Sequence, residues 1–458
     1  MKIAQSLRQA PFSLWLLAWV GLIAHPLLIF SIPIGSWLLP LATALAWACC
    51  RPRRPELGQW PVWIIIAVVT LGITYGAIAT MDRSWDGLAT WTANARWLAV
   101  DGTLEHPYFR DLDVFNYGRA YPLLQPILLA QAMTWLGEHG GRLLFPALWL
   151  LLVASLAPPL RRAGLTGSPL NLMVLGLALV PIFIEPGSGG AASGFADLLV
   201  AILALYATIA VAENLGIQAM LACLLLPMAK NEGFAYVLII VTVAAFACRH
   251  AAARGAAIGG TIGLAIWLPL QSQLIHPEAP FSASGINLAV APVCAWSYAT
   301  LISKSRSRIF LLIATAAALT VGLAGLATLE HTSIGSSMHR LATLNLDWEN
   351  LVQVVGVGLS QFVFIRKLGF TFLILIAVAW MLHRHRLAGD LRPLFAILAL
   401  AGAAIAAFLT TRPPELLGLF LKEGMPRYTS QWIGAAWLIS GLGIARLQSA
   451  HPETSALS

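Results

Sequence analysis

The first residue in the chain with a clear capacity for chemistry is Asp86. It stands about one helical turn beyond the end of an apolar stretch at 60–80. A carboxylate in that place could take a proton from a hydroxyl group and act as a general base. Aspartate is also a favoured cap at the start of a helix, and a helix is expected over 87–100. The neighbouring Trp85 is a candidate for substrate contact.

A second acid, Asp197, follows a glycine-rich segment at 185–196 and opens another apolar stretch. Glycines allow the backbone to approach a ligand or another backbone segment closely. The segment is not a nucleotide-binding phosphate loop, because no Gly-Lys-Ser sequence follows it. Asp197 is therefore the second catalytic candidate, with a helix cap as the alternative.

Two ionisable residues, Lys230 and Glu232, interrupt a stretch that is otherwise apolar from Ile217 to Cys248. Such residues are costly in an apolar environment unless they are paired, solvated or in use. Lys230 could bind a phosphate, and Glu232 could bind a cation or another side chain. The alternative is that the two residues only pair with each other at a turn between two short helices.

The last candidates stand late in the chain, next to apolar stretches. His339 and Arg340 precede a helix expected over 350–364, and Arg427 and Tyr428 lead into the final stretch. A guanidinium group binds phosphate oxygens bidentately, so Arg340 and Arg427 are candidate phosphate ligands. An arginine at such a boundary can also be a simple anchor.

The composition indicates where these residues act. Of the 458 residues, 59% are hydrophobic and only 10% are charged, and the mean hydropathy is +0.78. A soluble domain carries roughly a quarter charged residues, so a soluble enzyme, a disordered chain and a secreted disulfide scaffold are excluded. The cysteines show no disulfide or metal spacing and are expected to be buried thiols. The chain is therefore expected to be a polytopic membrane protein.

The elements that must position the candidate residues are helices, because stretches such as 60–80 are apolar on every face. The fold expected is all-α, a transmembrane bundle of roughly 12 to 14 spans with interfacial helices at 119–137 and 350–364. We expect one membrane domain over 1–458, with two spans in 1–50 and a cytoplasmic tail at 447–458. The expected spans are 11–30, 33–50, 60–80, 143–160, 169–186, 197–213, 216–229, 233–248, 256–272, 288–303, 309–328, 368–383, 393–410 and 429–446.

The charges fit an orientation with the N-terminus in the cytoplasm. Short basic groups such as 51–54 and 161–162 then fall inside, as the positive-inside rule requires. The formal charge of +8 comes from scattered groups and forms no basic stripe, so no nucleic-acid partner is expected. Most of the 20 acidic residues lie outside, and the exceptions are Glu56, Glu213, Asp390 and Glu453. The crowding of acids suggests that the outer face carries the function.

The order of these groups along the chain resembles the pattern of a known protein family. An aspartate opens the long external loop 81–118, Tyr121 and Pro122 precede an interfacial helix, and two arginines at 161–162 close a span. An acid at 197, a hairpin turn at 230–233 and an arginine before the last span follow. Over roughly 60–446 the chain resembles the GT-C superfamily of polytopic membrane glycosyltransferases, which includes protein O-mannosyltransferases and the aminoarabinose transferases that modify lipid A.

The resemblance implies a GT-C-like fold and a reaction. A sugar would pass from a polyprenyl-phosphate or polyprenyl-diphosphate carrier, with inversion, to a hydroxyl group on the non-cytoplasmic face of the membrane. It implies that Asp86 is the general base, that Asp197 shapes the site or holds a metal, and that Arg427 grips the donor phosphate. No cofactor is certain, and a divalent cation, if one is used, would be held by Asp86 and Asp197.

Further expectations concern the substrates and the location. Lys230 and Arg340 are additional phosphate ligands on their own chemistry, and the candidates for substrate contact are Glu232, Trp85, Tyr121, Tyr428 and His339. The expected partners are a polyprenyl-linked sugar, membrane lipids and a glycan, lipid or protein acceptor. The location implied is the inner membrane of a bacterium, with the site facing the periplasm and a role in cell-envelope glycan synthesis.

Two features depart from the family pattern, and other functions stay open. The first loop has one acid where some members have an adjacent pair, and the soluble C-terminal domain of several members is missing. The alternatives are a secondary transporter or flippase of a lipid or polar solute, and a polysaccharide polymerase or ligase. Transporters place ionisable groups near mid-membrane and show inverted repeats. Here the acids lie at the ends of spans and no repeat is evident, which favours the enzyme.

Overall fold

The computed structural model describes residues 10–50, 60–80, 87–114, 116, 118–119, 121–185, 190–191, 193–275, 277, 348–363, 365–410, 417–418 and 420–450. The regular structure of these residues is helical, and no strand occurs among them. Trp85, Asp86, His339, Arg340 and the expected spans 288–303 and 309–328 lie outside the described residues.

The helices follow one another along the chain with short connections. Their bounds are α2 Phe12–Ile29, α3 Leu38–Cys49, α4 Trp60–Thr80, η2 Gly87–Thr92, α5 Ala93–Asp101, α6 Pro107–Arg110, α7 Leu124–Gly141, α8 Leu144–Arg162, α9 Gly167–Ala178, α10 Pro181–Ile184, α11 Asp197–Glu213, α12 Gly216–Ala229, α13 Gly233–Phe246, α14 His250–Ile275, α18 Trp348–Val363, α19 Ile365–Leu368, α20 Thr371–Arg384, η3 Gly389–Leu391, α21 Arg392–Thr410, η4 Phe420–Gly424, α23 Met425–Ser430 and α24 Ile433–Ala450.

Several of these helices are both long and apolar, in agreement with the composition of the chain. Five helical segments among the described residues are long and apolar enough to cross a membrane: Phe12–Ile29, Pro61–Ala79, Leu144–Arg162, His250–Ile275 and Gly389–Thr410. Large apolar side chains on α4, such as Leu71 and Tyr75, are exposed, as expected of a helix that faces lipid. The protein is therefore helical with the character of a membrane protein.

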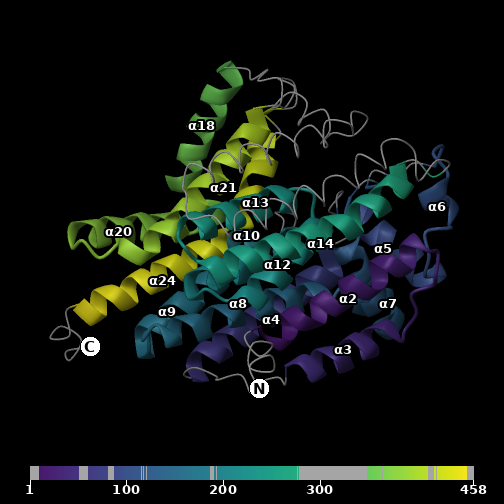
Figure 1. The fold of residues 1–458 in the computed structure, drawn as a ribbon, viewed down its shortest axis with the longest axis horizontal. Coiled ribbons are helices and arrows are strands. Elements are labelled where there is room, and N and C mark those ends of the chain that lie inside the picture. Colours follow the sequence, from purple (N-terminus) through teal and green to yellow (C-terminus); the bar gives the residue numbers. More distant parts are fainter. Residues whose placement is uncertain are drawn as a thin grey trace.

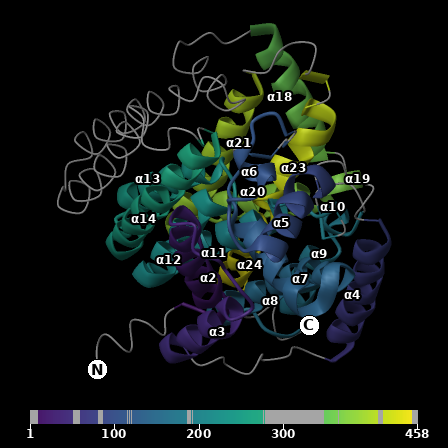
Figure 2. The same ribbon diagram turned by 90° about the vertical axis from the view of Figure 1, so that its right-hand side faces the viewer.

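The long helices α2, α8, α12, α14 and α24 run in roughly the same direction along the molecule, and α18 stands apart from them (Figure 1). Along this direction α11 lies inside the bundle (Figure 2), where it packs against α8, α12 and α24. Every residue of α11 from Asp197 to Val211 is buried. The site candidate Asp197 thus begins the most enclosed part of the described bundle.

The helices α12 and α14 pack closely together, and glycines allow this approach. A Cβ atom added to Gly255 would lie 1.9 Å from the carbonyl oxygen of Gly216, and one added to Gly259 would lie 1.9 Å from that of Met220. Small residues let transmembrane backbones approach this closely. This packing holds α12 in place, and Lys230 lies in the turn that directly follows α12.

Several expected boundaries were wrong. The span expected over 169–186 is two helices, α9 and α10, because Pro181 cannot donate a backbone hydrogen bond and starts a new helix. The helix expected over 256–272 begins earlier, at His250. The helix expected over 87–100 begins as the π-helix η2 and continues as α5. The expected helix 119–137 begins at Leu124.

Candidate functional site

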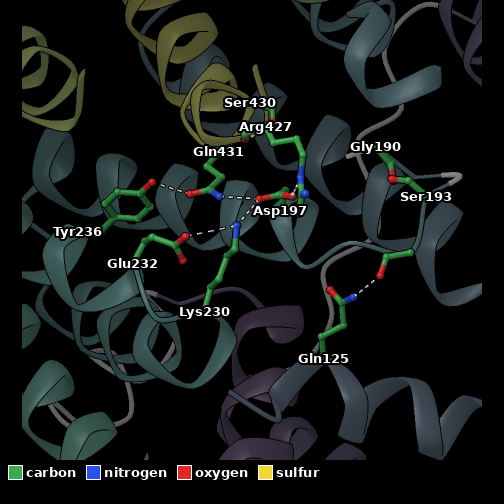
Figure 3. Close-up of polar contacts among 11 residues, drawn as sticks. Gln125, Gly190, Ser193, Asp197, Lys230, Glu232, Tyr236, Arg427, Ser430 and Gln431 are labelled. Atoms are coloured by element: carbon green, nitrogen blue, oxygen red, sulfur yellow. Dashed lines mark hydrogen bonds and ion pairs between the residues drawn. The ribbon is translucent and has the colours of Figure 1, made fainter. Parts of the chain in front are cut away.

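Asp197 is the centre of a buried polar cluster. It is the first residue of α11, and its side chain is fully buried. The residue in the capping position is Ala196, and the carboxylate of Asp197 points instead at three side chains from other parts of the chain (Figure 3). Asp197 therefore begins α11 and also binds side chains from distant parts of the chain.

Lys230 reaches Asp197 from the turn between α12 and α13. Its Nζ lies 2.7 Å from Asp197 Oδ1, and the ammonium is almost completely buried. The turn is tight because a Cβ on Gly233 would lie 2.0 Å from the carbonyl oxygen of Leu226. Burial alone would lower the pKa of Lys230, but the carboxylates of Asp197 and Glu232 outweigh it and raise the pKa above its ordinary value. Lys230 is therefore a cation in the folded protein.

Arg427 approaches Asp197 from the other side. It lies on α23, which has Pro426 in its first turn, and its Nε donates to Asp197 Oδ2 at 3.1 Å. The guanidinium carbon lies 3.8 Å from the ring centre of Phe195, a cation–π contact that fixes its plane. The side chain keeps 20% of its surface exposed, compared with 5% for Lys230. Arg427 is thus the more accessible cation of the cluster.

Two neutral residues that the sequence analysis missed complete the cluster. Gln431 Nε2 donates to Asp197 Oδ1 at 2.6 Å, and Gln431 Oε1 accepts from the hydroxyl of Tyr236 at 2.5 Å. The spacing of Gln431 and Tyr236 from other candidates in the sequence could have identified both residues. Gln431 follows Arg427 by four residues, and Tyr236 follows Glu232 by four, so each lies one helical turn from a recognised candidate.

Glu232 and Tyr428 border the same cluster. Glu232 Oε1 lies 3.7 Å from Lys230 Nζ, and Glu232 Oε2 is buried without a hydrogen-bond partner among the described residues. The Lys230 ammonium lies 4.9 Å from the ring centre of Tyr428. The pairing of Lys230 with Glu232 that the sequence left open does occur, but the closer carboxylate is that of Asp197. Two carboxylates and two cations thus meet at one place.

The helix η2 packs beside this cluster. Trp91, on η2, forms a small apolar group with Phe195 and Ala196, and Tyr121 packs edge-on against Trp91 with ring centres 5.6 Å apart. The helix that directly follows Asp86 in the sequence therefore lies against the segment that leads into Asp197. π-Helical turns often mark functional sites. η2 is one such turn, and a second, η4, directly precedes α23 and Arg427.

Several buried polar atoms on these elements have no hydrogen-bond partner among the described residues. The atoms are Thr90 Oγ1 on η2, both side-chain polar atoms of Asn94 on α5, and Gln125 Oε1 on α7. Gln125 Nε2 donates to the carbonyl oxygen of Gly194 at 2.9 Å, so α7 is tied to the glycine-rich segment (Figure 3). Leaving such atoms unpaired costs about 1–3 kcal/mol each, which favours a ligand that would satisfy them.

The described residues do not form a cation-binding site. No group of three or more His, Cys, Asp or Glu side chains occurs among them. Both carboxylate oxygens of Asp197 already face Lys230, Gln431 or Arg427, so this carboxylate is not arranged as a metal ligand.

Comparisons with known proteins do not extend this description. No protein-family model matches the chain, and no curated protein and no solved structure matches it either.

Proposed function

We propose that the chain is an inverting glycosyltransferase of GT-C type, which moves a sugar from a polyprenyl-phosphate or polyprenyl-diphosphate carrier to an acceptor hydroxyl group. The observation that carries the proposal is the pair of cations on Asp197. They come from positions 33 and 230 residues away in the sequence and meet at the start of one enclosed helix. Such an arrangement suits a phosphate group that gains charge during a reaction.

Arg427 and Lys230 are the residues we assign to the donor phosphate. Arg427, the more exposed cation, would contact the phosphate oxygens, and Lys230 would add positive charge from behind. Asp197 and Phe195 hold the guanidinium in place before the substrate arrives. A cation that is already oriented stabilises developing charge without reorganising during the reaction.

The proposed step has a simple balance. The acceptor oxygen attacks the anomeric carbon, and a new carbon–oxygen bond forms on the face opposite the phosphate. The bond from the anomeric carbon to the phosphate oxygen breaks, and its electron pair leaves with the carrier phosphate. The proton of the acceptor hydroxyl goes to the carboxylate of Asp86, the proposed general base. The packing of η2 on Phe195 supports this role, because η2 directly follows Asp86 in the chain.

The unpartnered polar atoms supply a place for hydroxyl groups. Thr90, Asn94 and Gln125 together offer one hydroxyl group, one amide group and one amide oxygen that have no partner among the described residues. Amide and hydroxyl side chains both donate and accept hydrogen bonds, as sugar hydroxyls require. Tyr121 and Trp91 provide the adjacent aromatic surface.

The remaining expectations belong to the same proposal. They are a bundle of roughly 12 to 14 spans, an inner-membrane location and an active site on the non-cytoplasmic face. A lipid-linked donor suits a helical membrane protein because its isoprenoid chain can enter between helices.

A secondary transporter is the second candidate, and the buried charge cluster is the observation that favours it. Ionisable groups inside a helical membrane bundle often mark a path for ions or protons. In proteoliposomes a transporter would move solute or protons down a gradient without a lipid-linked donor. An enzyme would show no such flux and would consume the donor.

The test of the phosphate assignment uses purified protein and a panel of polyprenyl-phosphate sugars. Arg427→Lys keeps the charge but loses the planar guanidinium, so the KM for the donor should rise roughly 10-fold to 150-fold. Arg392→Ala, which removes an exposed arginine elsewhere, should leave the KM unchanged. An unaltered dependence on donor concentration in Arg427→Lys would contradict the assignment.

A further inference from the structure

A second place in the molecule has the features of a binding site, and it lies at the other end of α11. A cavity of about 440 Å³ opens between the ends of α8, α11 and α24 and the start of α21. Glu213, which lines the cavity at the end of α11, lies 16 residues beyond Asp197 and thus about 24 Å along the helix axis. It is therefore distinct from the proposed transfer site.

The walls of this cavity are apolar and its rim is charged. Ile209, Leu391, Leu394 and Leu438 line it and are buried. The volume falls within the range of 300–1,000 Å³ that is usual for ligand sites. An amphiphilic ligand would match a cavity with an apolar wall and a charged rim.

The rim has one positive charge in excess. Arg162 binds Glu213 at 2.8 Å, and Arg446 binds Asp390 at 3.0 Å, so these four charges cancel. Arg249 also lines the cavity. It is half-buried, and no ion pair of its guanidinium occurs within the described residues. Each of the three arginines can turn N–H donors toward an anion.

We propose that this cavity binds the phosphodiester headgroup of an anionic phospholipid, with Arg249 as the principal ligand. Guanidinium groups match phosphate oxygens bidentately, and basic pockets between membrane helices bind anionic headgroups. The helices that form the cavity include Leu144–Arg162 and Gly389–Thr410, which are long and apolar enough to cross a membrane. The occupant proposed is therefore a membrane lipid, whereas a soluble phosphate shares only the headgroup chemistry. The inference does not depend on the transfer reaction.

The experiment is a titration of the purified full chain in neutral detergent, followed by native mass spectrometry. The ligands are phosphatidylglycerol, phosphatidylcholine and, as the soluble phosphate, glycerol 3-phosphate. The wild type should bind phosphatidylglycerol at least tenfold more tightly than either of the others. Arg249→Gln should weaken that binding about tenfold, the loss of roughly one charge-assisted hydrogen bond.

Two further variants separate the cavity from general surface charge. Arg254→Gln removes an exposed arginine one turn along, outside the cavity, and should bind as the wild type does. Ala212→Trp fills the cavity without changing charge and should abolish the preference for phosphatidylglycerol. Equal losses in Arg249→Gln and Arg254→Gln, unchanged binding in Ala212→Trp, or equally tight binding of glycerol 3-phosphate would each overturn the proposal.

Discussion

Replacing Asp197 with asparagine tests whether the buried cluster is held by charge. The substitution keeps the shape of the side chain and one carbonyl oxygen but leaves Lys230 and Arg427 facing a neutral group. Both cations are mostly buried, with 5% and 20% of their side-chain surface exposed, so water replaces little of the lost attraction. Breaking a buried ion pair by removing one partner costs about 3–5 kcal/mol. We expect Asp197→Asn to lower the free energy of unfolding by that amount.

A double-mutant cycle with Lys230→Met isolates the pair. Asp197, Glu232, Lys230 and Arg427 together are neutral, so each single variant leaves this buried cluster with a net charge, whereas the double variant is again neutral. The two effects should therefore sum to more than the double variant loses, with a coupling energy of about 1–3 kcal/mol. The assay is reversible unfolding in mixed micelles, followed by the intrinsic fluorescence of the tryptophans.

The matched control is Glu138→Gln, which removes the acid of an exposed ion pair with Arg96. Exposed pairs contribute about 0–1 kcal/mol, so this variant should unfold almost as the wild type does. If Asp197→Asn cost no more than the control, or if the cycle were additive, the cluster would not be the electrostatic centre described above.

Three other predictions concern the packing of α14 on α12, the charge of Lys230 and the side chain of Asn94. Gly255→Ala should lower the free energy of unfolding by about 1–3 kcal/mol, because the new methyl would meet the backbone of α12, whereas Gly402→Ala, which has open space, should not. The raised pKa of Lys230 should contribute to the free energy of unfolding in full below the ordinary lysine pKa of 10.5, and this contribution should be lost as the pH rises further. In Lys230→Met, the free energy of unfolding measured against pH should no longer show this loss. Asn94→Leu should raise thermal stability, because it removes buried polar atoms that have no partner among the described residues, and should lower the rate of sugar transfer. A fall in both would place Asn94 in the scaffold alone.

Local sequence features predicted the middle of the fold well. The helices expected over 197–213 and 216–229 are α11 and α12 with the same bounds. Asn214, in the left-handed conformation, ends α11 and makes a sharp break between two strongly apolar stretches. The expected span 169–186 failed at Pro181, where the apolar stretch continues but a new helix begins, because hydropathy does not register the lost backbone donor.

The candidate site could be predicted as a set of residues but not as an arrangement. Lys230 and Asp197 stand out because charges are rare in apolar stretches. Their contact with each other and with Arg427 depends on how α11, the turn after α12, and α23 pack together. Gln431 and Tyr236 are neutral, so composition gave no reason to select them, and only their four-residue spacing from Arg427 and Glu232 pointed to the site.

Sugar transfer with Asp86 as the general base is tested most directly by the single-turnover rate of transfer by Asp86→Asn. Purified wild-type protein in vesicles should move the sugar from a polyprenyl-phosphate donor to an acceptor. The variant should be at least 100-fold slower, the usual contribution of a general base, with unchanged donor binding and membrane insertion. Asp101→Asn, which alters an exposed acid at the end of α5, should transfer normally. Transfer by Asp86→Asn at the wild-type rate would contradict the account.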